Sequence, residues 1–310
     1  MSGKPVLRVV AAIIRDPDGA ILLSQRPLHK HQGGCWEFPG GKCEAGESDA
    51  SALAREIDEE LGLRIQESRP FMTVDHDYPE LSVRLCFREV LQFSGQPHGR
   101  EGQPVAWFAP EQLSGLQFPP ANRPVVSALG LPDQLLILPT PLPTDWREKI
   151  PAAIGRGNRL VYLRGIHDQT QAGELVELIH QHGGRALVAD DVALMQRVGA
   201  DGLHLTEAGA RGCQARPEVP LLSMACHDRT GLQRARDFKV ELVTLSPVAA
   251  TASHPDASPL GWPGFRQLAE GCPFAVYALG GMRLTDLDKA RQHGARGISG
   301  ISDFWNAQPI

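Results

Sequence analysis

Eight short apolar segments, separated by amphipathic stretches, fill the second half of this 310-residue chain. A segment such as "ALVAD" (186–190) suits a buried strand, whereas "QAGELVELIHQHG" (171–183) has the apolar spacing of a surface helix. Strands that alternate with helices favour a parallel sheet, and eight such units favour a closed (β/α)8 barrel of the TIM type. The eight segments are 135–140, 160–166, 186–190, 201–206, 221–228, 241–247, 274–281 and 295–302.

The first half of the chain has a different order of elements. Alternating and β-branched segments predict strands at 6–16, 20–26 and 81–93, with one strong helix and a closing helix among further strands. This order indicates an α+β fold. We therefore predict two domains, one of residues 1–132 and a barrel of residues 133–310, with no charge run or low-complexity linker between them.

Composition excludes several classes of protein. The chain has 42% hydrophobic and 22% charged residues and a net charge of −5, so it lacks the basic excess of a protein that wraps long nucleic acid. The apolar run Val9–Ile14 is too short for a membrane span or a secretory signal. Six cysteines without a C-x-x-C pair indicate reduced thiols and no zinc site. We expect a cytoplasmic protein that has no membrane or long nucleic-acid partner.

One helix of the first domain is unusually acidic. Ser48 or Asp49 is a suitable N-cap and Gly62 a suitable C-terminal stop, so the sequence predicts a helix over 50–61. Its apolar stripe repeats at four-residue spacing, which indicates that one face packs on a core. The stripe consists of Leu53, Ile57 and Leu61.

Three carboxylates lie together beside that stripe. Glu56, Glu59 and Glu60 occupy positions i, i+3 and i+4, which share one helix face. Each like-charge pair costs about 0.2–0.5 kcal/mol, and a bound divalent cation would offset the repulsion. Carboxylate oxygens favour Mg²⁺, with Mn²⁺ as a second possibility, over zinc. Considered alone, the three residues are equally compatible with a solvated acidic face.

The surrounding sequence resembles the signature of the Nudix hydrolases. Gly41 is followed after five residues by Glu47, and after seven more by "REIDEELGL" (55–63). The resemblance implies a magnesium site and hydrolysis of a nucleoside diphosphate linked to another group, with Arg55 orienting Glu47 through an ion pair. The implied metal ligands are Glu56, Glu59, Glu60 and the carbonyl of Gly40.

Three further segments resemble the MutT-type 8-oxo-dGTP diphosphatases: "WEFPGGK" (36–42), "GREGQPVAWF" (99–108) and "FPPANRPVV" (118–126). The resemblance implies that Asn122 reads the purine edge and that Phe38 helps to wall the base pocket. An alternative is that "FPPAN" is only a stiff turn before the last helix, and that His31 is a solvated loop residue. The other residues implied for nucleotide or metal are Arg26, His31, Gly41, Lys42 and, as a further metal ligand, Glu101; Leu81 departs from the basic residue of the relatives.

The barrel resembles thiamine-phosphate synthase and the related thiazole tautomerase over about residues 134–307. In that family glycine-rich loops cradle a phosphate, which implies a phosphate site at Gly280, Gly281 and Ser299. The family's charged catalytic set is depleted, so we expect a barrel without synthase activity that retains a site for a phosphorylated small molecule. Asp190 and Arg164 remain, whereas Ala189, Gly209, Ile166 and His254 replace family residues, and His204 is expected to be a packed histidine.

These patterns lead to one main expectation and two alternatives. The main expectation is a Mg²⁺-dependent enzyme that converts 8-oxo-dGTP to 8-oxo-dGMP and pyrophosphate and so sanitises the nucleotide pool. One alternative is a Nudix pyrophosphatase that acts on a thiamine-pathway diphosphate. The other is that the barrel is a binding module that senses a thiamine phosphate or docks a partner.

Overall fold

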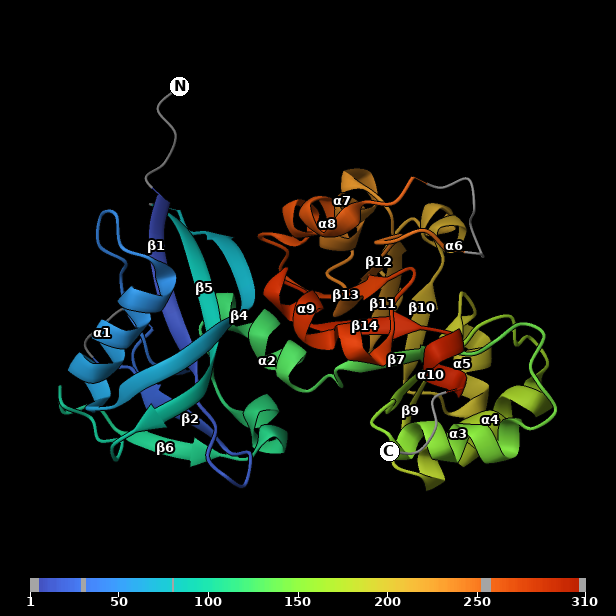
Figure 1. Cartoon of the computed structure of the whole chain (residues 1–310), viewed down its shortest axis with the longest axis horizontal. Coiled ribbons are helices and arrows are strands. Elements are labelled where there is room, and N and C mark those ends of the chain that lie inside the picture. The colour runs from blue at the N-terminus through green and yellow to red at the C-terminus, as the bar shows by residue number, and fades with distance from the viewer. Residues whose placement is uncertain (1–5, 29–31, 80, 252–257, 307–310) are drawn as a thin grey trace. The chain divides into compact units, whose positions relative to one another are not determined.

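The computed structural model describes residues 6–28, 32–79, 81–251 and 258–306 (Figure 1). The chain separates into two compact units. The first contains the described residues up to Gly130 together with Glu270–Pro273, and the second contains Leu131–Ala269 and the described residues from Phe274 onward. We describe each unit by itself.

The first unit is built on two three-stranded sheets packed with helices, in agreement with the predicted α+β fold (Figure 1). One sheet is mixed: its central strand pairs parallel with β1 and antiparallel with β4. The other sheet is antiparallel throughout. The mixed sheet has the order β1 (Val6–Ile13), β5 (Ser82–Ser94), β4 (Arg64–Asp77), and the second sheet has the order β3 (Trp36–Glu37), β2 (Ile21–Gln25), β6 (Val105–Phe108).

Helix α1 (Asp49–Leu61) is the predicted acidic helix, one residue longer at its start. Ser48 is its N-cap, and the Ser48 hydroxyl accepts a hydrogen bond from the Ser51 N–H at 3.2 Å. Gly62 ends the helix in the left-handed conformation, with φ +69°. The predicted apolar stripe is fully buried and packs in one cluster with Val10 of β1 and Leu22 of β2. The helix is therefore fixed to the sheets, and its acidic face is left beside the core.

The segment after β3 runs along β1 and brings two glycines under α1. The Ala12 N–H donates to the Pro39 carbonyl at 2.8 Å, and the Val10 N–H donates to the Gly41 carbonyl at 2.9 Å. Gly40 has φ +150°, and a Cβ there would lie 2.1 Å from the Val10 carbonyl oxygen. Only glycine fits such a close approach between two backbones.

The closing elements of the first unit are three short helices that follow β6. They are the 3-10 helices η1 (Pro110–Gly115) and η2 (Pro120–Asn122) and the helix α2 (Arg123–Leu129). Asn122 ends η2 and stands directly before α2, which agrees with the predicted closing helix.

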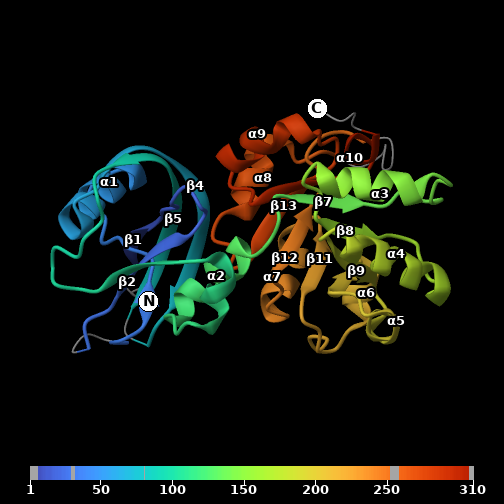
Figure 2. The ribbon, with the colours of Figure 1, turned by 90° about the horizontal axis from the view of Figure 1, so that it is seen from below.

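The second unit is a closed barrel of eight parallel strands, each followed by a helix (Figures 1 and 2). Every predicted apolar segment overlaps one strand, and β14 pairs with β7 to close the barrel. The strands are β7 (Gln134–Ile137), β8 (Leu160–Leu163), β9 (Arg185–Ala189), β10 (Gly202–Leu205), β11 (Leu222–Cys226), β12 (Leu242–Leu245), β13 (Ala275–Leu279) and β14 (Gly297–Gly300). The helices are α3 (Trp146–Gly155), α4 (Gln169–Gln181), α5 (Val192–Val198), α6 (Glu207–Gly212), α7 (Arg229–Asp237), α8 (Gly261–Ala269), α9 (Leu287–Gln292) and α10 (Ser302–Asn306), with the 3-10 turn η3 (Leu284–Asp286) before α9.

The (β/α)8 architecture is thus confirmed. Among the residues that the structure describes, no helix is long and apolar enough to cross a membrane.

Candidate active site

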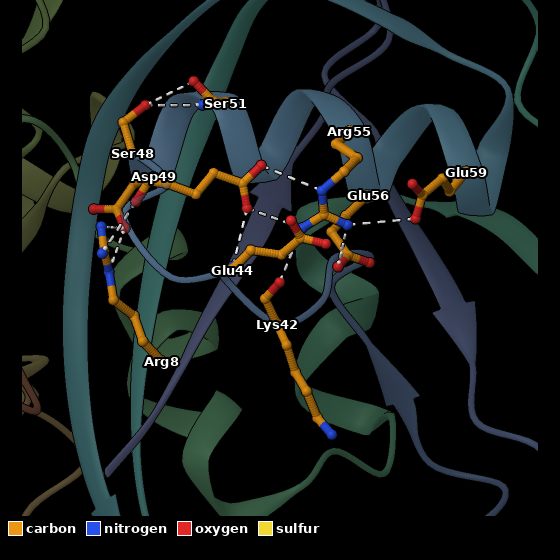
Figure 3. Close-up of polar contacts among 10 residues, drawn as sticks. Arg8, Lys42, Glu44, Ser48, Asp49, Ser51, Arg55, Glu56 and Glu59 are labelled. Atoms are coloured by element: carbon orange, nitrogen blue, oxygen red, sulfur yellow. Dashed lines mark hydrogen bonds and ion pairs between the residues drawn. The ribbon is translucent and has the colours of Figure 1, made fainter.

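Arg55 lies at the centre of the acidic helix face and joins it to the preceding loop (Figure 3). Its guanidinium donates to both carboxylate oxygens of Glu47, at 3.2 Å from Nε and 3.0 Å from Nη2, so the predicted ion pair is present. Nη2 also donates to the Lys42 carbonyl at 3.0 Å. The hydrogen bonds from Arg55 hold the pKa of Glu47 below its ordinary value. Glu47 is therefore a fixed anion in this arrangement.

The same guanidinium contacts two of the three predicted metal ligands. Nη1 donates to Glu56 Oε1 at 2.8 Å and to Glu59 Oε2 at 3.4 Å (Figure 3). The Glu56 side chain is only 15% exposed, whereas that of Glu59 is 61% exposed. A Cβ on Gly41 would lie 2.0 Å from Glu56 Oε2. Glu56 is thus enclosed between Arg55 and a glycine whose missing side chain makes room for its carboxylate.

Glu60 points into the same region from the next turn. The Gly40 N–H donates to Glu60 Oε2 at 3.1 Å. Burial, opposed by the hydrogen bond from the Gly40 N–H and aided by the negative charges of Glu37, Glu101 and Glu56, raises the pKa of Glu60 to about 7. Ionised Glu60 is therefore less favourable here than in water.

The chemistry of this donor set fits a hard divalent cation such as Mg²⁺ or Mn²⁺, because the available donors are carboxylate oxygens. The fit concerns the type of donor atom, because the side chains are not arranged as a preformed metal site. Across the described ranges, no three His, Cys, Asp or Glu side chains are grouped closely enough to hold a metal ion. Glu56 and Glu59 face Arg55 and would have to turn toward a cation. The metal-binding roles of the glutamates and of the Gly40 carbonyl stay predictions.

Glu101 reaches the site through a loop that docks on the end of α1. The loop makes hydrogen bonds to carbonyls of the last helical turn, and the charge of Glu101 lies near enough to raise the pKa of Glu60. Sequence reasoning named Glu101 but missed the two residues that dock the loop, Arg100 and Gln103. The sequence segment "GREGQP" was the only signal for these residues. Its letters alone do not reveal that the loop contacts α1, about forty positions earlier in the chain.

An aromatic cluster and a buried amide lie in the first unit beside these elements. The Phe38 side chain is 3% exposed; its ring stacks on that of Phe118 at 5.8 Å and meets that of Phe87 edge-on at 5.6 Å. Asn122, four residues after Phe118, is 7% exposed. Its carboxamide has no hydrogen-bond partner among the groups that the structure describes, although its backbone N–H donates to the Pro119 carbonyl. An amide without such partners has donors and an acceptor available for a ligand.

The remaining predicted nucleotide contacts differ in their settings. Arg26 forms an ion pair with Glu37, which sequence reasoning had not named. The Lys42 side chain runs away from Arg55, whereas its carbonyl accepts from it (Figure 3). His31 lies outside the described residues, as does His254 of the barrel. The substrate-binding roles of Arg26, His31, Gly41 and Lys42 stay predictions.

At the carboxyl ends of the barrel strands, Asp190 has structural partners. Its carboxylate accepts from the Thr206 N–H at 2.8 Å and from the Thr206 hydroxyl at 2.7 Å. The Thr206 hydroxyl in turn accepts from the Gly209 N–H and caps α6. A Cβ on Gly209 would lie 1.9 Å from Asp190 Oδ1, so the carboxylate fills the space that a side chain would need.

The predicted phosphate-binding residues of the barrel lie in two settings. Gly280 and Gly281 have φ of +101° and +69° and follow β13, as a phosphate-binding loop would. Ser299 lies inside β14 and is fully buried, and its hydroxyl donates to the Leu135 carbonyl at 3.1 Å. The side chain of Ser299 therefore bonds to the neighbouring strand, and a phosphate-binding role for the three residues stays a prediction.

His204 is packed inside the barrel, as the sequence predicts. It is 4% exposed, its Nδ1 is 2.7 Å from the Ser223 hydroxyl, and its ring lies against that of Tyr162 at 4.2 Å. Burial lowers the pKa of His204 to about 3. The imidazole is therefore neutral near pH 7.

Comparison with known proteins assigns each unit. Residues 10–128 match the family model of the NUDIX domain, and residues 145–304, which are more than half of the chain, match that of thiamine monophosphate synthase. The chain is a NUDIX hydrolase domain fused to a barrel of the thiamine monophosphate synthase family.

Relatives of the NUDIX domain include two enzymes of Escherichia coli. The 8-oxo-dGTP diphosphatase is 37% identical over 123 residues, which cover 40% of this chain and 95% of the relative. The CTP pyrophosphohydrolase is 39% identical over 125 residues, which cover 40% of this chain and 90% of the relative. The NUDIX domain is thus a nucleotide pyrophosphohydrolase, and similarity alone leaves the base open.

The barrel has relatives of its own. The putative thiamine-phosphate synthase 2 of Aquifex aeolicus is 29% identical over 167 residues, which cover 52% of this chain and 90% of the relative. Within this barrel, however, Asp190 is engaged with Thr206 and packed against Gly209. Asp190, which matches a charged residue of the family, thus makes hydrogen bonds that support the start of α6 in this barrel.

Proposed function

We propose that the NUDIX domain hydrolyses 8-oxo-dGTP to 8-oxo-dGMP and pyrophosphate with Mg²⁺ as the cofactor. The observation that carries this proposal is the carboxamide of Asn122, a residue only 7% exposed, which has no hydrogen-bond partner among the described groups and lies on the segment that also supplies Phe118 to stack on Phe38. An amide offers a donor and an acceptor side by side. The 8-oxoguanine edge presents the complement, an acceptor at O6 and an N–H at position 7.

Base selectivity follows from the cost of unpaired polar groups. Guanine has only an acceptor at N7, so the carbonyl of Asn122 would face a lone pair in place of an N–H. A buried group left without its partner costs about 1–3 kcal/mol, and sites built on such groups discriminate strongly. The likeness to a CTP pyrophosphohydrolase makes CTP the competing substrate, but a pyrimidine lacks the N7 edge that this argument requires.

The residues of the acidic helix have distinct parts in the proposed reaction. Glu56, Glu59, Glu60 and Glu101 would hold Mg²⁺, which polarises phosphoryl oxygens and lowers the pKa of a bound water. Arg55 donates to Glu56 Oε1, so Glu56 Oε2 is the oxygen that would accept a proton from the attacking water. Arg55 fixes Glu47 and Glu56 on opposite sides of one guanidinium. The rigid fork of Arg55 thereby limits where the Glu56 carboxylate can lie.

The test is the substrate preference of Asn122→Ala. Wild-type and variant chains are assayed for pyrophosphate release from 8-oxo-dGTP, dGTP, CTP and thiamine diphosphate. We expect kcat/KM for 8-oxo-dGTP to fall about 100-fold or more and that for dGTP to change little, because only the oxidised base loses a matched pair. Gln112→Ala, at an exposed glutamine of η1, is the control.

Two results would contradict the proposal. An equal loss on 8-oxo-dGTP and dGTP would make Asn122 a structural residue of the turn. A wild-type preference for CTP or thiamine diphosphate would assign the domain to another substrate.

We also propose that the barrel has no synthase activity and binds a phosphorylated small molecule near Gly280 and Gly281. Coupling a pyrimidine diphosphate to a thiazole phosphate requires positive charge to stabilise the leaving pyrophosphate. Of the family's charged set only Asp190 and Arg164 remain, and Asp190 is bonded to Thr206. The full chain carrying Glu56→Gln, which removes competing hydrolysis of the diphosphate, should form no thiamine phosphate. Calorimetry with thiamine phosphate and with inorganic phosphate tests the binding. Formation of thiamine phosphate would contradict the proposed loss of synthase activity, and an absence of heat with both ligands would contradict the proposed phosphate site.

A further inference from the structure

The carboxyl end of α1 is closed by a loop that contains Glu101. A helix leaves its last four carbonyls without partners inside the helix. Here the Arg100 guanidinium donates from Nη1 to the Asp58 carbonyl at 2.7 Å, and the Arg100 N–H donates to the Glu60 carbonyl at 2.9 Å. The His98 N–H donates to the Leu61 carbonyl at 3.2 Å. The loop is therefore held against the same helical turn that ends the glutamate face.

Gln103 adds a bond of a different kind. Its Nε2 donates to the Glu60 carbonyl at 3.2 Å, and its Oε1 accepts from the Glu101 N–H at 2.9 Å. One carboxamide thus connects the backbone of Glu60 on α1 with the backbone of Glu101. A simple helix cap would need only the first of these bonds, whereas the second fixes the backbone of Glu101 next to that of Glu60.

Glycines leave room for this docking. A Cβ on Gly62 would lie 2.7 Å from the His98 ring and 2.9 Å from Arg100 Nε. A Cβ on Gly99 would lie 1.9 Å from the Gln103 carbonyl oxygen. The helix end and the loop approach so closely at Gly62 that a side chain there would clash, and at Gly99 the loop turns back so tightly on Gln103 that a side chain would clash with the loop itself.

We propose that Arg100 and Gln103 are positioning residues that hold Glu101 beside Glu60, so that the loop and the helix form one cation-binding unit. The proposal rests on the proposed metal-dependent function of the NUDIX domain. Outer partners that orient metal ligands change metal affinity or activity by about 10- to 100-fold. Neither residue touches the reacting atoms, and each acts through Glu101.

The test is a double-mutant cycle on the full chain with Mn²⁺ as the probe, its binding followed by electron paramagnetic resonance. Gln103→Met removes both carboxamide bonds and keeps the side-chain length. We expect it to weaken Mn²⁺ binding about 10-fold in the wild-type chain and to have little further effect in the Glu101→Gln chain, because the effect is transmitted through Glu101. Gln112→Met is the matched control, since Gln112 Oε1 also accepts a loop N–H, that of Ala109 at 2.8 Å, outside the acidic helix. The control should leave Mn²⁺ binding unchanged.

A second variant keeps the test decisive if Gln103→Met fails to fold. Arg100→Met breaks the docking at the Asp58 carbonyl, and it should show the same dependence on Glu101. Equal losses in the wild-type and Glu101→Gln chains, or no loss at all, would overturn the proposal. Mn²⁺ binding requires no nucleotide, so this result is independent of whether 8-oxo-dGTP is the preferred substrate. In steady-state assays, Gln103→Met should raise the Mg²⁺ concentration needed for half-maximal rate more than it changes KM for the nucleotide.

Discussion

Carboxylates occur both on the acidic helix of the NUDIX domain and at the mouth of the barrel, but their partners differ. Among the described residues, the Glu60 carboxylate accepts one hydrogen bond, from the Gly40 N–H, and three other negative charges raise its pKa. Asp190 accepts two hydrogen bonds from Thr206 and fills the space beside Gly209. A bound cation would stabilise the ionised form of Glu60, whereas Thr206 already supplies hydrogen bonds to both carboxylate oxygens of Asp190. A residue type shared with a family therefore indicates chemistry only when its partners leave it available.

The largest effect that would sharpen this contrast is expected from Glu56→Gln. Glu56 is the enclosed carboxylate between Arg55 and Gly41, and its proposed proton transfer contributes about 10²- to 10⁴-fold to a rate. We expect kcat for pyrophosphate release to fall by at least 100-fold while the fold is retained, because one like charge is removed. Glu111→Gln, at an exposed position of η1, is the control. Near-normal turnover at limiting Mg²⁺ would remove Glu56 from the active site.

A second effect is expected in the barrel at acid pH. The pKa of His204 is lowered to about 3 by burial, whereas an unfolded histidine titrates near 6.5. The unfolded chain therefore binds the proton first, and the stability contributed by neutral His204 is complete above pH 6.5 and lost as the pH falls toward 3. The loss is about 1.4 kcal/mol per pH unit below 6.5.

The measurement is urea unfolding of the full chain between pH 7 and 4.5, comparing wild type with His204→Asn. Asparagine retains a polar partner for the Ser223 hydroxyl but does not titrate. The difference in free energy of unfolding between the two chains should shrink as the pH falls. His167→Asn, at an exposed histidine, is the control. A constant difference for His204→Asn would show that its protonation is not linked to folding.

The acidic helix should show the opposite dependence on pH. The folded pKa of Glu60 is raised to about 7 from an ordinary 4.5, so the folded chain retains its proton longer than the unfolded chain. The stability from this proton is complete below pH 4.5 and is lost as the pH rises through 7. Without metal, Glu60→Gln should therefore stabilise the protein at pH 8, by about 1–3 kcal/mol, and by much less at pH 4.5.

Thermal unfolding in the presence of a chelator measures this difference. Glu67→Gln, at an exposed glutamate of β4, is the control and should show no such change between the two pH values. If the difference in stability between Glu60→Gln and the wild type were the same at both pH values, the pKa of Glu60 would not be raised in the folded chain. Added Mg²⁺ should stabilise the wild-type chain more than the variant.

The smallest effect is expected for Asp190→Ala. The substitution removes two neutral-donor hydrogen bonds that support the cap of α6, so we expect a loss of about 1–2 kcal/mol in the free energy of unfolding. Asp228→Ala is the matched comparison, because Asp228 caps α7 through the Gly231 N–H. Pyrophosphate release by the NUDIX domain should not change. Loss of phosphate-ligand binding by Asp190→Ala, with binding retained in Asp228→Ala, would place Asp190 in a functional site.

Regular patterns were predicted well because they are local. The bounds of α1 follow from a capping serine, an apolar stripe and a terminal glycine, and all eight barrel strands follow from short apolar runs. The 14-residue strand β4 was not recognised. Its polar start "RIQES", an internal Pro70 and register shifts on both sides of Glu67 and after Pro70 interrupt the alternation that identifies a strand.

Only the site residues that lie close together in the sequence were predicted. The glutamates and the Arg55–Glu47 pair lie within one motif, so their proximity follows from helix and loop geometry. The bonds of Arg100 and Gln103 to α1 join residues more than forty positions apart, and the contact of Asp190 with Thr206 joins two different strand ends. Such contacts depend on how the whole chain folds, and no local pattern encodes them.

Closure of the barrel through β14 and β7 also has a consequence for the order of events during synthesis. All strands of the NUDIX domain lie between Val6 and Phe108, so both of its sheets can be complete while the ribosome is still making the second unit. The first barrel strand, in contrast, lacks one neighbour until Gly297–Gly300 has emerged. Contacts between residues so distant in sequence form slowly. Until β14 pairs with β7, the nascent barrel therefore has two exposed sheet edges, whereas both sheets of the NUDIX domain can already be complete.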